Sequence, residues 1–157
     1  MALPEIGSTA PDFATVNQRG ENVSLQDFRG QYLVVYFYPK ALTPGCTTQA
    51  CGIRDVAAEL AELNAVAVGI SPDDSARLQR FDDKYELGFD LLADTDHSIA
   101  EAWGVWGLKK FMGKEYMGVN RITFIVDPDG KVAHVIPKVK TTTHHDDVLA
   151  LLRHSAS

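Results

Sequence analysis

The sequence predicts an α/β fold in which helices flank a central mixed β-sheet, with an N-terminal β-hairpin ahead of the first long strand. Apolar, β-branched runs alternate with amphipathic segments through most of the chain, which is the rhythm of β-α-β units. Two later strand-like runs flank a strong turn signal, which favours antiparallel pairing, and a last amphipathic segment predicts a terminal helix. We therefore expect parallel and antiparallel strands in one sheet.

Length and composition indicate one folded domain. The chain has 157 residues, of which 45% are hydrophobic and 23% charged, so we expect a single domain over residues 1–157. The net charge of −6 would repel nucleic acid and an anionic membrane. No apolar run approaches the roughly 20 residues that span a bilayer, and the start lacks a basic, apolar leader. We expect a cytoplasmic protein.

The N-terminal part predicts the hairpin, the central strand and a helix. Short apolar stretches at 13–16 and 23–25 can pair, and residues 32–38 are apolar without polar alternation, as in a strand covered on both faces. Thr43 is a suitable N-cap and Pro44 suits the first helical position. Apolar residues then recur at helical spacing at positions 46, 50, 53, 57 and 60, so we expect one helix that extends to about residue 60.

The rest of the chain continues the alternation of strands and helices. The two strands that flank the turn sequence at 127–130 are then expected to pair in antiparallel orientation. In chain order we expect a strand at 65–70, a helix that starts after 71–74, a strand near 89–92, a helix at 97–103, a glycine-punctuated loop at 104–118, strands at 121–126 and 132–136, and a helix at 143–152.

Only two cysteines are present, Cys46 and Cys51, too few for a disulfide scaffold. Their Cys-x4-Cys spacing differs from the Cys-x-x-Cys of thioredoxin-like reductases, and no second pair completes a structural zinc site. They are either two small buried hydrophobes or a reactive pair.

The start of the first helix is a suitable place for a reactive thiol, because unpaired N–H groups and the helix dipole favour the thiolate of Cys46. Ionisation alone raises reactivity only about thirtyfold, so the second reactant must also be aligned and its developing charge stabilised. Candidates are the Thr43 hydroxyl, the Cys46 N–H and Arg121, although Arg121 could equally be a surface charge at a strand end. Pro39 either ends the strand or shields the thiolate from water.

The residues around Cys46 resemble a known family. Residues 39–46 match the Pro-x-x-x-Thr-x-x-Cys signature of peroxiredoxins, and residues 46–51 resemble the peroxiredoxin Q branch, also called bacterioferritin comigratory protein. The resemblance extends to residues 104–107, 111–114 and 121–127, and so covers essentially the whole chain.

The resemblance implies a thioredoxin-like fold and a thiol peroxidase that reduces hydrogen peroxide and organic hydroperoxides. By position, Cys46 corresponds to the peroxidatic cysteine and Cys51 to the resolving cysteine. Thr43 and Arg121 would then orient the peroxide and stabilise its leaving oxygen, while Pro39 shields the pocket.

The implied cycle requires no metal or organic cofactor. A sulfenic acid on Cys46 condenses with Cys51, and an external thioredoxin, or alternatively a glutaredoxin, reduces the disulfide. A resolving cysteine within the same chain favours a monomer. Gln49 occupies a position where the family often has a polar or acidic residue near the active-site arginine, and its role is left open. A thiol–disulfide oxidoreductase and a redox-sensing relay are the alternative functions.

Disulfide formation must be coupled to a conformational change. Five residues along an ideal helix separate two Cα atoms by about 8.7 Å, whereas a disulfide tolerates about 4.4 to 6.8 Å, so the helix must unwind locally between Cys46 and Cys51. On helix propensity, Gly52→Ala should therefore slow disulfide formation and increase overoxidation.

Two other pairs of residues have open interpretations. His144 and His145 stand beside acidic residues, as in some metal sites, but adjacent histidines on a helix point in different directions. Phe111 and Met112 are either buried or part of an exposed apolar patch.

Overall fold

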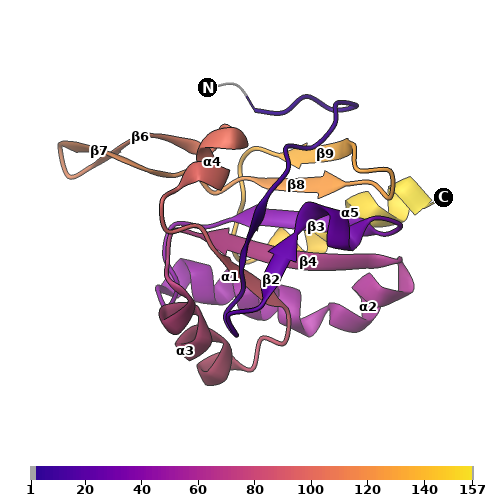
Figure 1. Cartoon of the computed structure of the whole chain (residues 1–157), viewed down its shortest axis with the longest axis horizontal. Helices are drawn as coiled ribbons and strands as arrows, with labels where there is room; N and C mark the ends of the chain where they lie inside the picture. Colours follow the sequence, from indigo (N-terminus) through magenta and orange to yellow (C-terminus); the bar gives the residue numbers. More distant parts are fainter. Residues whose placement is uncertain (1–2, 157) are drawn as a thin grey trace.

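The computed structural model describes residues 3–156, which surround a five-stranded mixed sheet of order β5-β4-β3-β8-β9 (Figure 1). Central β3 (Tyr32–Phe37) runs parallel to β4 (Ala65–Ser71) and antiparallel to β8 (Thr123–Val126). At the edges, β5 (Asp90–Ala93) is parallel to β4, and β9 (Val132–Ile136) is antiparallel to β8. The predicted mixed sheet is confirmed.

Helices cover both faces of this sheet. They are α1 (Pro44–Asp55), α2 (Ala57–Glu62), α3 (Ser75–Tyr85), α4 (Ser98–Ala102) and α5 (His144–Ala156).

The two faces of β3 belong to different parts of the core, because successive side chains of a strand point to opposite sides. Val34 and Tyr36 pack with apolar residues of α1, α2, α3 and α5. Leu33, Val35 and Phe37 pack with α4 and the N-terminal segment. The single helix expected as far as residue 60 is wrong in one respect, since it breaks at Val56 into α1 and α2.

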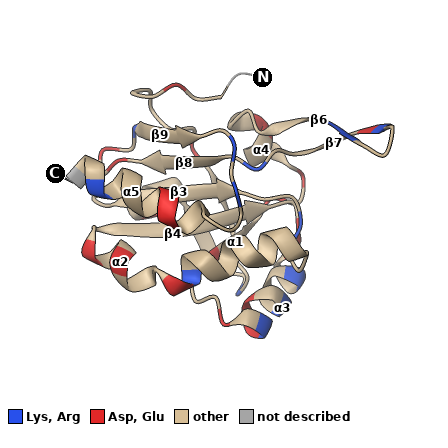
Figure 2. Cartoon of the chain, turned by 180° about the vertical axis from the view of Figure 1, so that it is seen from behind, with Lys and Arg blue, Asp and Glu red and all other residues tan. Residues whose placement is uncertain are grey.

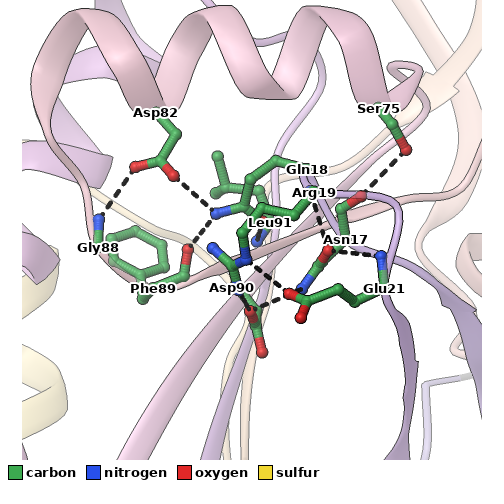
Figure 3. A network of polar contacts seen from close by, with 10 residues as sticks. All are labelled: Asn17, Gln18, Arg19, Glu21, Ser75, Asp82, Gly88, Phe89, Asp90 and Leu91. Carbon is green, nitrogen blue, oxygen red and sulfur yellow. Dashed lines mark hydrogen bonds and ion pairs between the residues drawn. The ribbon is translucent and has the colours of Figure 1, made fainter.

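The predicted N-terminal hairpin is present as β1 (Ala14–Val16) and β2 (Asn22–Ser24), followed by the short 3-10 helix η1 (Leu25–Phe28). Its turn is fastened to the body of the protein by buried Gln18 (Figure 3). The Gln18 amide donates to the Phe89 carbonyl at 2.8 Å and to an Asp82 carboxylate oxygen at 3.0 Å, and its oxygen accepts the Leu91 N–H at 2.9 Å.

Residues expected as a loop form a second hairpin, β6 (Trp106–Phe111) and β7 (Lys114–Val119), which projects from the body (Figure 1). The prediction failed because most of these side chains are exposed, so the segment lacks the apolar pattern of a buried strand. The turn residues Met112 and Gly113 both have positive φ, at 56° and 78°, as two-residue hairpin turns require. Phe111 and Met112 are exposed.

The hairpin is also the basic part of an acidic chain: three lysines and one glutamate lie on β6 and β7 (Figure 2). Among residues 3–156, no helix combines the length and apolar character needed to cross a membrane.

Candidate active site

Cys46 is the third residue of α1, at the carboxyl end of central β3. Its side chain is only 1% exposed, and its thiol is free. Pro44 at the first helical position has no N–H, and Thr43 makes no capping hydrogen bond. The remaining N–H groups of the first turn have no intrahelical partner, as at any helix start, and Thr43 does not cap them.

Arg121, which shortly precedes β8, reaches this thiol. One guanidinium nitrogen, Nη2, donates to the Cys46 Sγ at 3.4 Å, and the other, Nη1, donates to Oε1 of Gln49 at 2.7 Å. Arg121 is therefore part of the site and not an isolated charge at a strand end. Gln49, whose role the sequence left open, accepts this hydrogen bond and so helps to hold the guanidinium in place.

Two further buried residues complete this network. The amide nitrogen of Gln49 lies 3.3 Å from Nδ1 of His144, and Nε2 of His144 lies 2.8 Å from Oγ1 of Thr123. Burial, with smaller effects from His145 and Arg121, lowers the pKa of His144 to about 4, so the imidazole is neutral near pH 7.

The segment between β3 and α1 is anchored to the segment after β4. The carboxylate of Asp73 accepts the Ala41 N–H at 2.7 Å, and Arg77 both pairs with Asp73 at 3.2 Å and donates to the Ala41 carbonyl at 2.7 Å. This clamp holds Leu42 at a φ of 68°, in the left-handed region. The start of α1 is thereby fixed to the carboxyl end of β4.

The two remaining predicted residues lie in the same segment but do not contact the thiol through a hydrogen bond. The Thr43 hydroxyl donates to the Lys40 carbonyl at 2.7 Å. Pro39 and Lys40 line a cavity of about 280 Å³ together with residues of the β6–β7 hairpin, among them Lys109. Burial and the positive charge of Arg121 lower the pKa of Lys109.

Cys51 lies on α1 as expected and is also free, partly buried against the core that this helix shares with α2, α3 and α5. Its neighbour Gly52 packs directly under His145, since a Cβ at Gly52 would lie 2.4 Å from the ring nitrogen Nδ1. No group of three or more metal-binding side chains occurs within residues 3–156, and His144 faces Gln49 and Thr123.

Three residues near the site, His144, Thr123 and Asp73, were not predicted from the sequence. One signal was available: Thr123 follows Arg121 by two residues at the start of a strand, so both share one face. Nothing in the local sequence places His144 against Gln49, because 95 positions separate them.

Comparison with known proteins shows which family the chain belongs to. Residues 6–135 match the family model described as the AhpC/TSA family. Peroxiredoxin Bcp of Escherichia coli K12 is 52% identical over 150 residues, covering 96% of this chain and 96% of that protein. Peroxiredoxin Bcp of Bacillus subtilis is 48% identical over 149 residues, covering 95% of each.

A solved structure of Xanthomonas campestris bacterioferritin comigratory protein, described in connection with its alkyl peroxide reduction activity, superimposes with a TM-score of 0.90. It is 32% identical and matches 100% of both chains. The thioredoxin-like fold is thus confirmed. The chain belongs to the AhpC/TSA family, in the peroxiredoxin Q or Bcp branch, and it is a thiol-dependent peroxidase.

Proposed function

We propose that Cys46 is the thiol that attacks the peroxide and that Arg121 stabilises both its thiolate and the leaving oxygen. The observation that carries this proposal is the guanidinium nitrogen 3.4 Å from the Sγ of a thiol that is 1% exposed. If Cys46 were only a small buried hydrophobe, its neutral side chain would not account for a positively charged guanidinium placed against the sulfur. A thiol so enclosed is also better suited to a small peroxide than to a protein disulfide.

In the proposed reaction, the Cys46 thiolate attacks one peroxide oxygen and the O–O bond breaks. The second oxygen leaves as hydroxide or alkoxide and takes up a proton, giving water or an alcohol, while Cys46 becomes a sulfenic acid. Arg121 and the free N–H groups of the first turn of α1 lie where negative charge develops.

Thr43 and Pro39 act on the peroxide and its surroundings in this proposal. The Thr43 hydroxyl donates to the Lys40 carbonyl, so its oxygen is free to accept a hydrogen bond from a hydroperoxide O–H. Pro39 is half-buried beside the site and reduces access of water to the sulfur.

Cys51 then resolves the sulfenic acid, with loss of water and formation of a Cys46–Cys51 disulfide. Both cysteines lie on the continuous helix α1, where their Cα atoms are about 8.7 Å apart for ideal geometry. Because a disulfide tolerates about 4.4 to 6.8 Å, α1 must unwind between the two chemical steps.

The substrates we propose are hydrogen peroxide and organic hydroperoxides, supported by the alkyl peroxide reduction described for the Xanthomonas relative. We propose a thioredoxin-type reductant and action as a monomer, because the resolving cysteine is in the same chain. A cycle that must return both cysteines to thiols suits a reducing compartment, so we propose that the protein acts in the cytoplasm.

The test is a brief pulse of equimolar hydrogen peroxide on fully reduced protein, followed by alkylation and intact-mass measurement. Wild type should lose two hydrogens, Cys51→Ser should stop at the sulfenic acid, and Cys46→Ser should keep its remaining thiol. A wild type that retains both thiols would overturn the proposal and favour thiol–disulfide exchange with proteins.

A further inference from the structure

The chemistry of the buried network fixes the orientation of Gln49. The Arg121 guanidinium has only hydrogen-bond donors, so the Gln49 atom at 2.7 Å from it must be the amide oxygen. The amide nitrogen of Gln49 therefore faces Nδ1 of His144, at 3.3 Å. The opposite rotamer would place two donors against each other.

The same logic fixes the proton on His144. An amide nitrogen only donates, so Nδ1 must accept and carries no hydrogen. A neutral imidazole then has its hydrogen on Nε2, which donates to Oγ1 of Thr123 at 2.8 Å. Both ring nitrogens are thus satisfied in a ring that is fully buried, and the lowered pKa of His144 agrees with the neutral form.

We propose that His144 is a positioning residue for the peroxidase reaction: its Nδ1 holds the Gln49 amide so that Gln49 keeps the Arg121 guanidinium on the Cys46 sulfur. This inference rests on the proposed role of Cys46.

The contacts form a closed network, which explains how His144 can influence Arg121 without touching it. Thr123 is the first residue of β8, and Arg121 stands two residues before it along the chain. From there the hydrogen bonds run through Gln49 on α1 to His144 on α5 and return to Thr123. Without the acceptor on His144, Gln49 loses one of its two anchors and a buried amide N–H loses its partner.

This hydrogen-bond network also depends on α1 remaining helical. Gln49 lies between Cys46 and Cys51 and is fully buried, so local unwinding of α1 for disulfide formation withdraws it from His144. His144 therefore holds Arg121 in place for the attack on peroxide and releases it in the resolving step.

The test compares three substitutions that separate the two contacts of His144. In His144→Asn, the side-chain oxygen occupies the place of Nδ1 and can accept from Gln49. His144→Gln reaches only Thr123, and His144→Phe makes neither contact. His134→Asn, at a half-buried histidine remote from the network, is the matched control.

The rate of Cys46 oxidation by hydrogen peroxide is measured by rapid quench and intact mass in each protein, with near-ultraviolet circular dichroism to establish folding. We expect His144→Asn and His134→Asn to stay close to wild type, and His144→Gln and His144→Phe to be slower by about tenfold or more. Nitrogen-15 spectra of wild type should show the Nε2–H tautomer of His144.

Equal rates in all folded variants, or loss of rate in His144→Asn as large as in His144→Phe, would overturn the proposal, as would a Nδ1–H tautomer. These outcomes are distinct from failure of the proposed function, in which wild-type Cys46 itself would not react.

Discussion

At the scale of single residues, Gly52 determines how closely α1 can approach α5. A Cβ at this position would lie 2.4 Å from Nδ1 of His145 and 3.0 Å from the adjacent ring carbon, which is closer than packed atoms approach. The expectation from helix propensity, that Gly52→Ala would slow disulfide formation, did not take this contact into account.

We now expect Gly52→Ala to lower the free energy of unfolding by about 1–3 kcal/mol, the usual cost of overpacking. Because the added methyl group pushes α1 away from α5, disulfide formation should become faster and the sulfinic acid yield in a peroxide titration should fall. Urea unfolding and intact mass measure the two effects.

Two further variants control this result. A second change, His145→Ala, removes the ring and should restore stability. At Gly45, a Cβ would meet only Arg121 Nη2 at 3.5 Å and Thr141 at 3.8 Å, so Gly45→Ala fits and should raise the sulfinic acid yield through helix propensity. Unchanged stability in Gly52→Ala would show that His145 moves aside without cost.

At the scale of elements, the position of α1 depends on the clamp between Asp73 and the segment that precedes the helix. Asp73 accepts the Ala41 N–H and pairs with Arg77, and its side chain is 8% exposed. Removing the carboxylate leaves the Ala41 N–H without its acceptor and abolishes the ion pair of Arg77, which keeps only its hydrogen bond to the Ala41 carbonyl. Strained Leu42 can then relax.

We expect Asp73→Ala to lower the free energy of unfolding by about 2 kcal/mol and to slow Cys46 oxidation by about tenfold, since a small misplacement of reacting groups is costly. Asp74→Ala is the matched control: it removes the N-cap that accepts the Arg77 N–H at 2.8 Å but not the clamp. Its free energy of unfolding should fall by about 1 kcal/mol, and its rate of Cys46 oxidation should be unchanged. Equal rates in the two variants would contradict the role of the clamp.

The elements that could be predicted from the sequence are those whose buried positions appear in it as a regular pattern of apolar residues. Residues 32–38 and 65–70 are continuous apolar runs because β3 and β4 are covered on both faces. The β6–β7 hairpin leaves no such pattern, because its two strands pair mainly with each other in solvent and its turn places Met112, a residue without turn preference, at positive φ.

The same distinction holds for the site. Cys46 and Thr43 could be placed at the start of a helix from local capping signals. The convergence of Arg121, Gln49 and His144 arises from contacts between distant segments, and no periodicity in one sequence records such contacts.

At the scale of the whole molecule, stability in acid should depend on His144. Burial, His145 and Arg121 lower its folded-state pKa from the ordinary 6.5 to about 4. Between these values the unfolded chain binds a proton that the folded protein does not, so stability is complete above about pH 6.5 and falls as the pH falls toward 4. The loss from this group reaches about 3 kcal/mol.

Other buried groups titrate in the same range, so the measurement must be a difference. Desolvation and His154 lower the pKa of His134, which acts in the same direction, whereas burial raises the pKa of Asp94, which acts in the opposite direction. Both groups are retained in His144→Asn, and their contributions cancel when its free energy of unfolding in urea is subtracted from that of wild type at each pH.

Between about pH 7 and about pH 4.5, the free energy of unfolding of the wild type should fall by about 2–3 kcal/mol more than that of His144→Asn. This loss arises mainly because burial disfavours the charged imidazole, and also because a proton on Nδ1 would face the Gln49 amide and add a second positive charge near Arg121. Curves that stay parallel over this range would mean that His144 takes up its proton equally well in both states. The fully buried, neutral ring that connects α5 to α1 would then be ruled out, because such a ring must resist protonation as long as the fold is intact.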